Sequence, residues 1–268
     1  MNRWTISRPL AQACLPLFIV LAAGCQSNSA NQAGQHGASH GGAPHWSYTG
    51  DTGPAHWGSL SPEYSLCAVG RSQSPINITE TTNVDLPNIG FHYEAVPVDI
   101  INNGHTVQVN YKSGSWIDIN GSRYDLAQFH FHSPSEHTIA GKKFPAEMHL
   151  VHKSSDGRLA VIGVLLAEGA NNPKFEPVWR HLPAQPGKAT RFDDMINAAD
   201  LLPADVRTLR YQGSLTTPPG TEGVSWFVMT EPVTLSKEQI AAFRRIHDGN
   251  ARPTQPLNGR TVQRDTSK

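Results

Sequence analysis

Short runs that alternate apolar and polar residues, separated by turn-forming pairs, most limit what this chain can fold into. Residues 107–111 alternate in this way, which is the two-residue period of a strand with one wet face. Turn pairs such as Asn103-Gly104 and Asn120-Gly121 lie between such runs. Glycine (23) and proline (20) are frequent, which favours turns and short strands over long helices. We therefore expect a mostly β (α+β) fold with a large, mainly antiparallel sheet.

Five further runs have the length and residue types of strands. They are residues 98–102, 127–132, 146–152, 159–166 and 223–230. Helical pattern is confined to 172–181, which precedes Pro183, and to 236–247, where Ser236 can cap the first turn and Glu238 follows in it. The sequence therefore predicts a few peripheral helices around the sheet.

The first 24 residues have the features of a signal peptide of the lipoprotein type. Arg3 and Arg8 precede an apolar run, 9–23, that is too short to span a bilayer comfortably. The run ends in small residues followed by Cys25, an arrangement that resembles the bacterial lipobox, in which the cysteine is lipidated. We expect the membrane as a partner, through a lipid on Cys25. Cleavage by an ordinary signal peptidase and an uncleaved anchor are the alternatives.

Residues 25–44 are predicted to be a flexible polar linker, because 26–44 contain no aromatic and no charged residue. Residues 45–268 show no internal repeat, and we expect a single domain there. From the predicted signal peptide and linker we expect an exported protein, either a periplasmic or a cell-surface lipoprotein. By resemblance, Gln26 directly after Cys25 favours the outer membrane. A soluble periplasmic or secreted form is the alternative.

The charge balance and the cysteine count narrow the chemistry further. The chain has 22 basic and 22 acidic residues, which argues against a nucleic-acid partner. Cys14 would leave with the signal peptide and Cys25 would carry lipid, so Cys67 would have no internal partner. We expect it to be a free thiol or to form an intermolecular bond, and the chain to be a monomer or a homodimer.

Thirteen histidines are the compositional outlier, and the segment 128–132 is the most informative place among them. On a strand, Gln128, His130 and His132 point to one face, and the two phenylalanines between them point to the other. If 146–152 lies antiparallel beside this strand, Glu147 and His149 share the same face. Three histidines with an open fourth position are what catalytic zinc requires. The alternative is a set of half-buried histidines satisfied by ordinary hydrogen bonds.

From His45 to Arg260 the chain resembles the α-class carbonic anhydrases. Nine motifs carry the resemblance, in the family's order: 46–48, 53–57, 73–78, 102–105, 128–132, 135–137, 147–152, 213–219 and 250–253. The resemblance implies a central, mainly antiparallel twisted sheet of about ten strands, with Zn²⁺ at the bottom of a conical cleft. It also implies the reversible hydration of carbon dioxide to bicarbonate and a proton.

The resemblance also assigns roles to individual residues. It implies that His130, His132 and His149 hold zinc, and that Gln128, Glu147 and a backbone carbonyl near Asn250 accept their outer N–H groups. Thr216 would orient the zinc-bound hydroxide by donating to Glu136, and His105, with a pKa near the ordinary 6.5, would shuttle protons. The carbon dioxide pocket would consist of Val151, Val161, Leu215 and Trp226. The water chain would be lined by Tyr48, Asn103, Gln108 and Thr217, and His137 and His152 would be structural.

One position departs from the family pattern. Many bacterial relatives pair a cysteine at the position of Cys67 with a second one after the double proline, where this chain has Gly220. We therefore expect no such cross-link and some loss of stability. Three other functions stay open: a non-catalytic binding module, a zinc hydrolase acting on esters or peptides, and a zinc-buffering protein.

Overall fold

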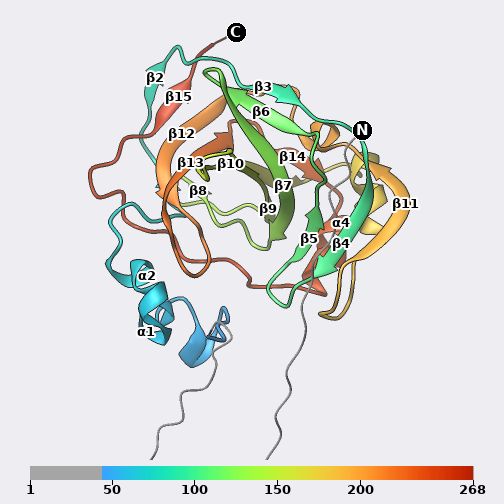
Figure 1. Cartoon of the computed structure of the whole chain (residues 1–268), viewed down its shortest axis with the longest axis horizontal. Helices are drawn as coiled ribbons and strands as arrows, with labels where there is room; N and C mark the ends of the chain where they lie inside the picture. The colour runs from blue at the N-terminus through green and yellow to red at the C-terminus, as the bar shows by residue number, and fades with distance from the viewer. Residues whose placement is uncertain (1–43, 268) are drawn as a thin grey trace, which may run out of the picture. The chain divides into compact units, whose positions relative to one another are not determined.

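The computed structural model describes residues 44–267, and one large twisted sheet dominates them (Figure 1). Ten strands follow one another across it in the order β11-β4-β5-β7-β9-β10-β13-β12-β15-β2, and three more attach beside this path. The strands are β2 (Thr82–Val84), β3 (Gly90–His92), β4 (Val96–Asn102), β5 (Val107–Asn110), β6 (Trp116–Ile119), β7 (Ser122–His132), β9 (Ala146–Lys153), β10 (Leu159–Glu168), β11 (Thr190–Ile196), β12 (Thr208–Ser214), β13 (Glu222–Met229), β14 (Val233–Leu235) and β15 (Gln263–Asp265).

Most neighbouring strands run antiparallel, as the sequence predicts. Within the large sheet the parallel pairs are β10 with β13, β10 with β14, and β15 with β2. A separate pair of two-residue strands, β1 (Asn77–Ile78) and β8 (Thr138–Ile139), is also parallel. The fold class is therefore confirmed, and the ten-strand path matches the expected size of the sheet. The strand expected over 98–102 begins two residues earlier, so Pro97 lies inside β4, opposite Met195 of β11 and beside an irregularity in that pairing.

The helices are short and lie at the periphery. They are α1 (Trp57–Leu60), α2 (Leu66–Val69), α3 (Glu176–Trp179) and α4 (Lys237–Arg244), together with the 3-10 turns η1 (Gly50–Thr52), η2 (Pro62–Tyr64), η3 (Pro173–Phe175) and η4 (Ala198–Leu201). Ser236 caps α4 as expected, in a capping box whose other partner is Gln239 rather than Glu238. The helix predicted over 172–181 is instead η3 followed by the single turn α3. None of the helices within residues 44–267 is long and apolar enough to cross a membrane.

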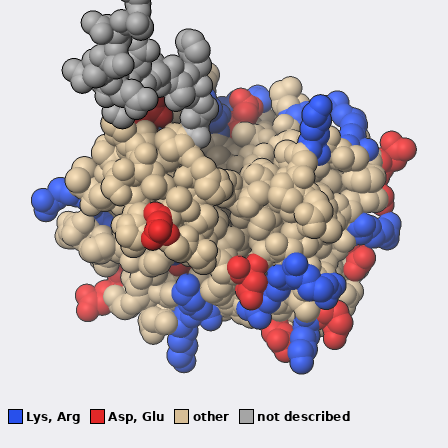
Figure 2. Space-filling view, turned by 90° about the horizontal axis from the view of Figure 1, so that it is seen from below, with Lys and Arg blue, Asp and Glu red and all other residues tan. Residues whose placement is uncertain are grey.

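The two faces of the sheet carry different cores. The larger core includes Phe129 and Phe131 of β7, Met148 and Leu150 of β9, and Phe227 of β13. The smaller one includes Val161 of β10, Tyr211 of β12 and Trp226 of β13. Alternation along β7 and β9 turns the histidines away from the larger core, so they lie on the face that also carries the smaller one. Figure 2 shows one side of the molecular surface. Charged side chains of both signs are interspersed there, and that side carries no extended basic patch.

Candidate metal centre

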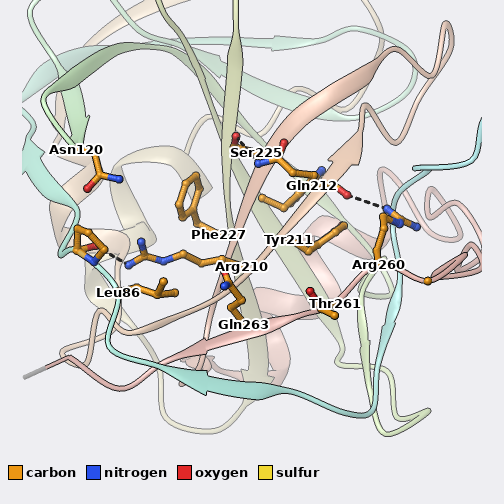
Figure 3. Close-up of a pocket in the computed structure, with 13 residues that line it drawn as sticks. Leu86, Asn120, Arg210, Tyr211, Gln212, Ser225, Phe227, Arg260, Thr261 and Gln263 are labelled. Atoms are coloured by element: carbon orange, nitrogen blue, oxygen red, sulfur yellow. Dashed lines mark hydrogen bonds between the residues drawn. The ribbon is translucent and has the colours of Figure 1, made fainter.

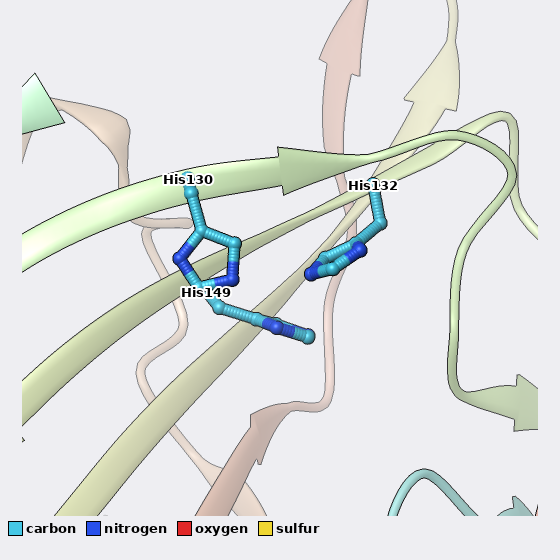
Figure 4. Close-up of side chains that lie close together, drawn as sticks. All are labelled: His130, His132 and His149. Atoms are coloured by element: carbon cyan, nitrogen blue, oxygen red, sulfur yellow. The ribbon is translucent and has the colours of Figure 1, made fainter. Parts of the chain in front are cut away.

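Three histidines on two neighbouring central strands form the candidate site (Figure 4). In the antiparallel pairing of β7 with β9, His130 lies directly opposite His149, and His132 lies opposite Glu147. One ring nitrogen from each of the three histidines lies within 4.8 Å of the others. His132 and His149 are each 1 % exposed, and His130 is partly buried. The antiparallel pairing and the shared face that the sequence predicted for these residues are therefore confirmed.

The other ring nitrogen of each histidine has a hydrogen-bond acceptor. Nδ1 of His130 donates to Oε1 of Gln128 at 2.9 Å, and Nδ1 of His132 donates to the carbonyl of Asn250 at 2.7 Å. Nε2 of His149 donates to Oε1 of Glu147 at 2.9 Å. These bonds fix the tautomers and leave one lone pair on each ring for a metal. The three acceptors expected by resemblance all lie where they were expected.

Glu147 is the most heavily hydrogen-bonded group of the site. One carboxylate oxygen accepts from the backbone N–H groups of Glu136 and His137, at 2.9 and 2.8 Å. The other accepts from the rings of His137, at 2.7 Å, and His149. Burial alone would raise the pKa of Glu147, but the two histidines hold it well below its usual range. His137 also contacts the Tyr211 hydroxyl at 2.6 Å, as expected for a hydrogen-bonded core residue.

The pKa values of the three histidines differ according to their neighbours. Burial lowers the pKa of His130 well below the usual value. The other two histidines lower it further, because a protonated His130 would be repelled by their positive charge. Burial lowers the pKa of His132 too, against the pull of Glu136. Burial would do the same to His149, but the Glu147 carboxylate raises its pKa instead. Glu147 therefore favours a cation at His149, whether a proton or a metal ion.

Glu136 lies beside these rings with one oxygen free. Its Oε1 accepts from the backbone N–H of Arg252 at 2.8 Å. Its Oε2 lies 3.5 Å from Nε2 of His132 and 3.8 Å from Nδ1 of His149. In residues 44–267, Oε2 of Glu136 and Nε2 of His132 are the buried side-chain atoms without a hydrogen-bond partner. The bond expected from Thr216 to Glu136 is thus not formed, because Oε2 faces the histidine nitrogens. Thr216 itself is buried.

Comparison with known proteins places this geometry in a family. Residues 52–266 match the model of the eukaryotic-type carbonic anhydrases. A carbonic anhydrase of Neisseria gonorrhoeae is 43 % identical over 248 residues, covering 92 % of this chain and 95 % of that protein. One from Pectobacterium carotovorum is 45 % identical over 219 residues, covering 81 % and 90 %. The solved α-carbonic anhydrase of Thermovibrio ammonificans, in complex with the inhibitor sulfanilamide, covers 83 % of this chain and all of its own, with 44 % identity and a TM-score of 0.81.

The chain belongs to the carbonic anhydrase family. The four residues that the family resemblance placed in the substrate pocket are indeed brought together. Val161 and Trp226 belong to the smaller core, and Val151 and Leu215 pack against it. The Trp226 ring lies 4.9 Å from the His149 ring, centroid to centroid. An apolar wall therefore adjoins the histidine cluster, as expected.

The residues expected between the metal centre and solvent are more scattered. His105 lies on the turn between β4 and β5, half-buried, with its ring stacked on that of Trp46 at 3.7 Å. Burial, helped by nearby His45, lowers the pKa of His105 below the ordinary value of a histidine. Tyr48 packs edge-on against Trp46, and burial with the charge of Glu136 keeps its pKa well above 10, so its hydroxyl stays protonated.

The remaining three residues predicted for the water chain have structural contacts of their own. Gln108 faces His130 across the β5–β7 pair and donates to Asn110 at 2.7 Å. Asn103 is exposed, and its side-chain oxygen accepts from the backbone N–H groups of His105 and Thr106, each at 3.0 Å. Thr217 is partly buried, and its carbonyl accepts from Gly220. Asn103 therefore shapes the turn that carries His105.

Among residues 44–267 Cys67 has no disulfide partner, and the position opposite it is Gly220. A Cβ added to Gly220 would lie 2.7 Å from the Cys67 sulfur. The position that the family resemblance pairs with Cys67 therefore lies against it, and it carries no sulfur in this chain. Cys25 and the predicted signal peptide lie outside the described residues, as does the linker except for its last residue, Pro44.

Two residues near the site make contacts that sequence reasoning did not assign, apart from the Asn250 carbonyl that was expected to accept from His132. Arg252 is fully buried, its guanidinium donates to Gln73, Ser74 and Cys67, and its backbone N–H holds Glu136. Asn250 is buried beside His132. Both belong to the 250–253 motif, so the motif was the available signal. What it could not give was the direction of each contact.

A cavity of about 540 Å³ is lined by residues of β12, β13 and neighbouring loops, with no histidine among its lining residues (Figure 3). Its lining includes Arg210 and Phe227, which alternate with residues facing the smaller core. Arg210 donates to Thr208, Pro87 and Asp265, and Arg260 donates to the Gln212 carbonyl at 3.0 Å and to three more carbonyls. Both guanidinium groups are thus held in place by hydrogen bonds to the protein.

Proposed function

We propose that this protein is a zinc-dependent carbonic anhydrase that catalyses the reversible hydration of carbon dioxide to bicarbonate and a proton. The observation that carries the proposal is the convergence of three imidazole lone pairs, each on a ring whose other nitrogen is already hydrogen-bonded. Such a set has no use in an ordinary hydrogen-bonded core, because it leaves Nε2 of His132 buried without a partner.

The donor set fits zinc. Nε2 of His130, Nε2 of His132 and Nδ1 of His149 would hold it, and three neutral nitrogens leave a fourth position open. When bound, zinc lowers the pKa of a coordinated water to near neutrality, so that hydroxide is available at physiological pH. The carboxylate of Glu147, hydrogen-bonded behind His149, raises the basicity of that ligand.

The apolar wall would receive the substrate. Carbon dioxide has no net dipole and gains little from hydrogen bonds, whereas bicarbonate is an ion that prefers water. Val151, Val161 and Trp226 offer no side-chain acceptor, and the Trp226 N–H is already donated to the Ser214 carbonyl at 2.9 Å. The pocket would therefore hold carbon dioxide beside the metal and release bicarbonate.

Three side chains would orient the reacting water or carry the released proton. Glu136 has a free, buried oxygen, and Thr216 would donate its hydroxyl to that oxygen once the histidine nitrogens are occupied, which leaves the Thr216 oxygen as an acceptor toward the reacting water. His105, half-buried at the turn after β4, would take the released proton on its ring and pass it to buffer. Its lowered pKa makes it a ready proton donor to solvent.

Stopped-flow measurement of carbon dioxide hydration tests the proposal. Activity of the purified protein should vanish on chelation and return with one equivalent of zinc. The substitution His132→Ala should abolish both zinc binding and activity, whereas His92→Ala, on an exposed histidine, should change neither. A folded, zinc-loaded protein without activity would refute the catalytic assignment and favour a binding module.

We further propose that residues 1–24 direct export and that Cys25 is lipidated, with the outer membrane as the destination and a flexible tether over 25–44. The support is the sequence alone: two arginines, a short apolar run, and small residues before Cys25. Mass spectrometry of the membrane fraction should find a diacylated N-terminal cysteine. A soluble, unmodified chain from wild type, indistinguishable from Cys25→Ala, would contradict this.

We also propose that the protein is a monomer or a homodimer. Analytical ultracentrifugation would distinguish the two.

A further inference from the structure

Asn250 uses every polar group of its side chain to join two parts of the site. Its Oδ1 accepts from the backbone N–H of Ser133 at 2.8 Å. Its Nδ2 donates to the carbonyl of Phe131 at 3.1 Å and to the carbonyl of His105 at 3.0 Å. The residue is 3 % exposed. A buried amide with all these bonds satisfied is rigid, because losing any of them leaves a buried polar group unpaired.

These partners lie on both sides of a metal-ligand candidate. His132 stands between Phe131 and Ser133, so the Asn250 amide holds the strand end before and after it. The backbone carbonyl of Asn250 also accepts from the His132 ring. The third side-chain contact reaches His105, which is 145 positions away in the sequence. One residue therefore touches both the end of β7 that presents His132 and the turn that presents His105.

Other hydrogen bonds also join the end of β7 and the β4–β5 turn to neighbouring segments, but none of them replaces the bond from Asn250 to His105. Gly249 donates to the Ser133 carbonyl at 2.7 Å, and His247 contacts Oδ1 of Asn102, the oxygen that also accepts from Gly104. Thr106 donates its hydroxyl to the Phe131 carbonyl at 2.5 Å. Among the hydrogen bonds of the described residues, however, only that of Asn250 reaches the carbonyl of His105 itself.

We propose that Asn250 is a positioning residue that fixes where His105 lies relative to the metal ligands. This inference rests on the proposed function, because it assigns His105 the proton-transfer role. Trp46 stacks on the His105 ring and restrains it from one side. Asn250 restrains the backbone from which the ring projects. Without it, the turn gains freedom and the ring spends less time at the distance at which water can carry a proton to it.

Two substitutions separate this role from a merely structural one. Asn250→Asp keeps the shape and the acceptor for Ser133, but it loses both N–H donors and turns an oxygen toward two carbonyls. Asn250→Ala removes the side chain and keeps the carbonyl that holds His132. Asn83→Asp, on an exposed strand residue, is the matched control for the added charge. If one variant fails to fold, the other still tests the proposal.

The first measurement is amide hydrogen exchange of the metal-free protein. We expect exchange at Gly104, His105 and Thr106 to become about tenfold faster in either variant, while β9 keeps its wild-type protection. The second is steady-state kinetics of the zinc-loaded protein. We expect kcat to fall about three- to tenfold, kcat/KM to stay within about twofold of wild type, and imidazole buffer to restore kcat.

The outcomes are distinguishable. Unchanged exchange in the turn, or a fall in kcat/KM and zinc affinity together with kcat, would overturn the proposal, because Asn250 would then act on His132 alone. An inactive wild-type enzyme would instead contradict the proposed function. The exchange measurement would still decide whether Asn250 holds the turn.

Discussion

Two buried histidines of β9, three residues apart, have opposite surroundings and opposite pKa shifts. His149 faces the metal centre beside the ionised Glu147, which raises its pKa against the effect of burial. His152 points to the other face, where its partners are the Tyr93 hydroxyl at 2.8 Å and the Ala160 carbonyl at 3.3 Å. There burial lowers the pKa to about 3. Burial alone therefore keeps a histidine neutral, and a carboxylate on the same face prepares it for a cation.

The largest expected difference is in zinc binding. His149→Ala should lose bound zinc and reduce carbon dioxide hydration by more than about a thousandfold, since it removes a ligand. His152→Ala should retain one zinc per chain and near-normal kcat/KM, with a stability loss of about 2–3 kcal/mol from the cavity and its unpaired partners. Zinc content and urea unfolding measure the two effects. Equal zinc loss in both variants would break the contrast.

The carboxylate can be tested apart from the histidines. Glu147→Gln keeps an oxygen near His149 but removes the negative charge, so zinc affinity should fall about 10- to 100-fold. Tyr93→Phe removes the hydroxyl beside His152 and should leave zinc affinity unchanged. Competition with a zinc chelator gives both constants. An unaltered affinity in Glu147→Gln would mean that the charge of Glu147 does not support the metal.

Lowering the pH should change the contributions of His152 and His149 to the free energy of unfolding in opposite directions. The folded-state pKa of His152 lies below the unfolded value near 6.5, so the unfolded chain takes up a proton first. Its contribution to stability is present above pH 6.5 and is lost as the pH falls toward 3, by about 2 kcal/mol at pH 5. His149, with a raised pKa, contributes stability that is present below pH 6.5 and lost as the pH rises above it.

Urea unfolding of metal-free protein at pH 5 and pH 7 checks these signs. His152→Gln should reduce the loss of stability at pH 5, and His149→Gln should increase it. If both variants changed the loss of stability at pH 5 in the same direction, the two faces of β9 would not differ in how they shift the pKa of a histidine. Tyr93 and Ala160 are uncharged, and the charge of Asp125 raises the pKa of His152 by less than burial lowers it, so salt should change the His152 effect little.

A third histidine, half-buried and on a turn, gives the smallest effect. His105→Ala should reduce kcat about tenfold, leave kcat/KM nearly unchanged, and respond to imidazole buffer, because only proton release depends on it. Stopped-flow kinetics in dilute and concentrated buffer measures this. A kcat that is unchanged in dilute buffer would remove His105 from the proton path.

The sequence predicted what alternation controls. The two-residue period placed Gln128, His130 and His132 on one face, and the same period added Glu147 and His149 once β7 and β9 were paired. Periodicity also marked the core strands, because a strand with two differently packed faces must alternate. Local cap chemistry likewise marked the start of α4 at Ser236.

Sequence reasoning missed features that the alternation of residues along a strand does not determine. The contacts of Asn250 and Arg252 span more than a hundred residues, and nothing local indicates which groups they meet. The lowered pKa of His105 depends on how deeply a turn packs, and the orientation of Glu136 depends on which neighbouring polar atoms compete for it. The signal peptide and lipid anchor remain predictions, since those residues lie outside 44–267.

Gly220 has a consequence for where this enzyme can mature. Its φ of 70° suits glycine, and with no second sulfur opposite Cys67 the described residues, 44–267, form no internal disulfide. Thiol reductants should therefore leave its melting temperature unchanged, and folding should proceed equally in a reducing cytoplasm and in an oxidising compartment. A relative that has both sulfurs would depend on an oxidant or an oxidoreductase to reach full stability. This chain would acquire its stability wherever it folds.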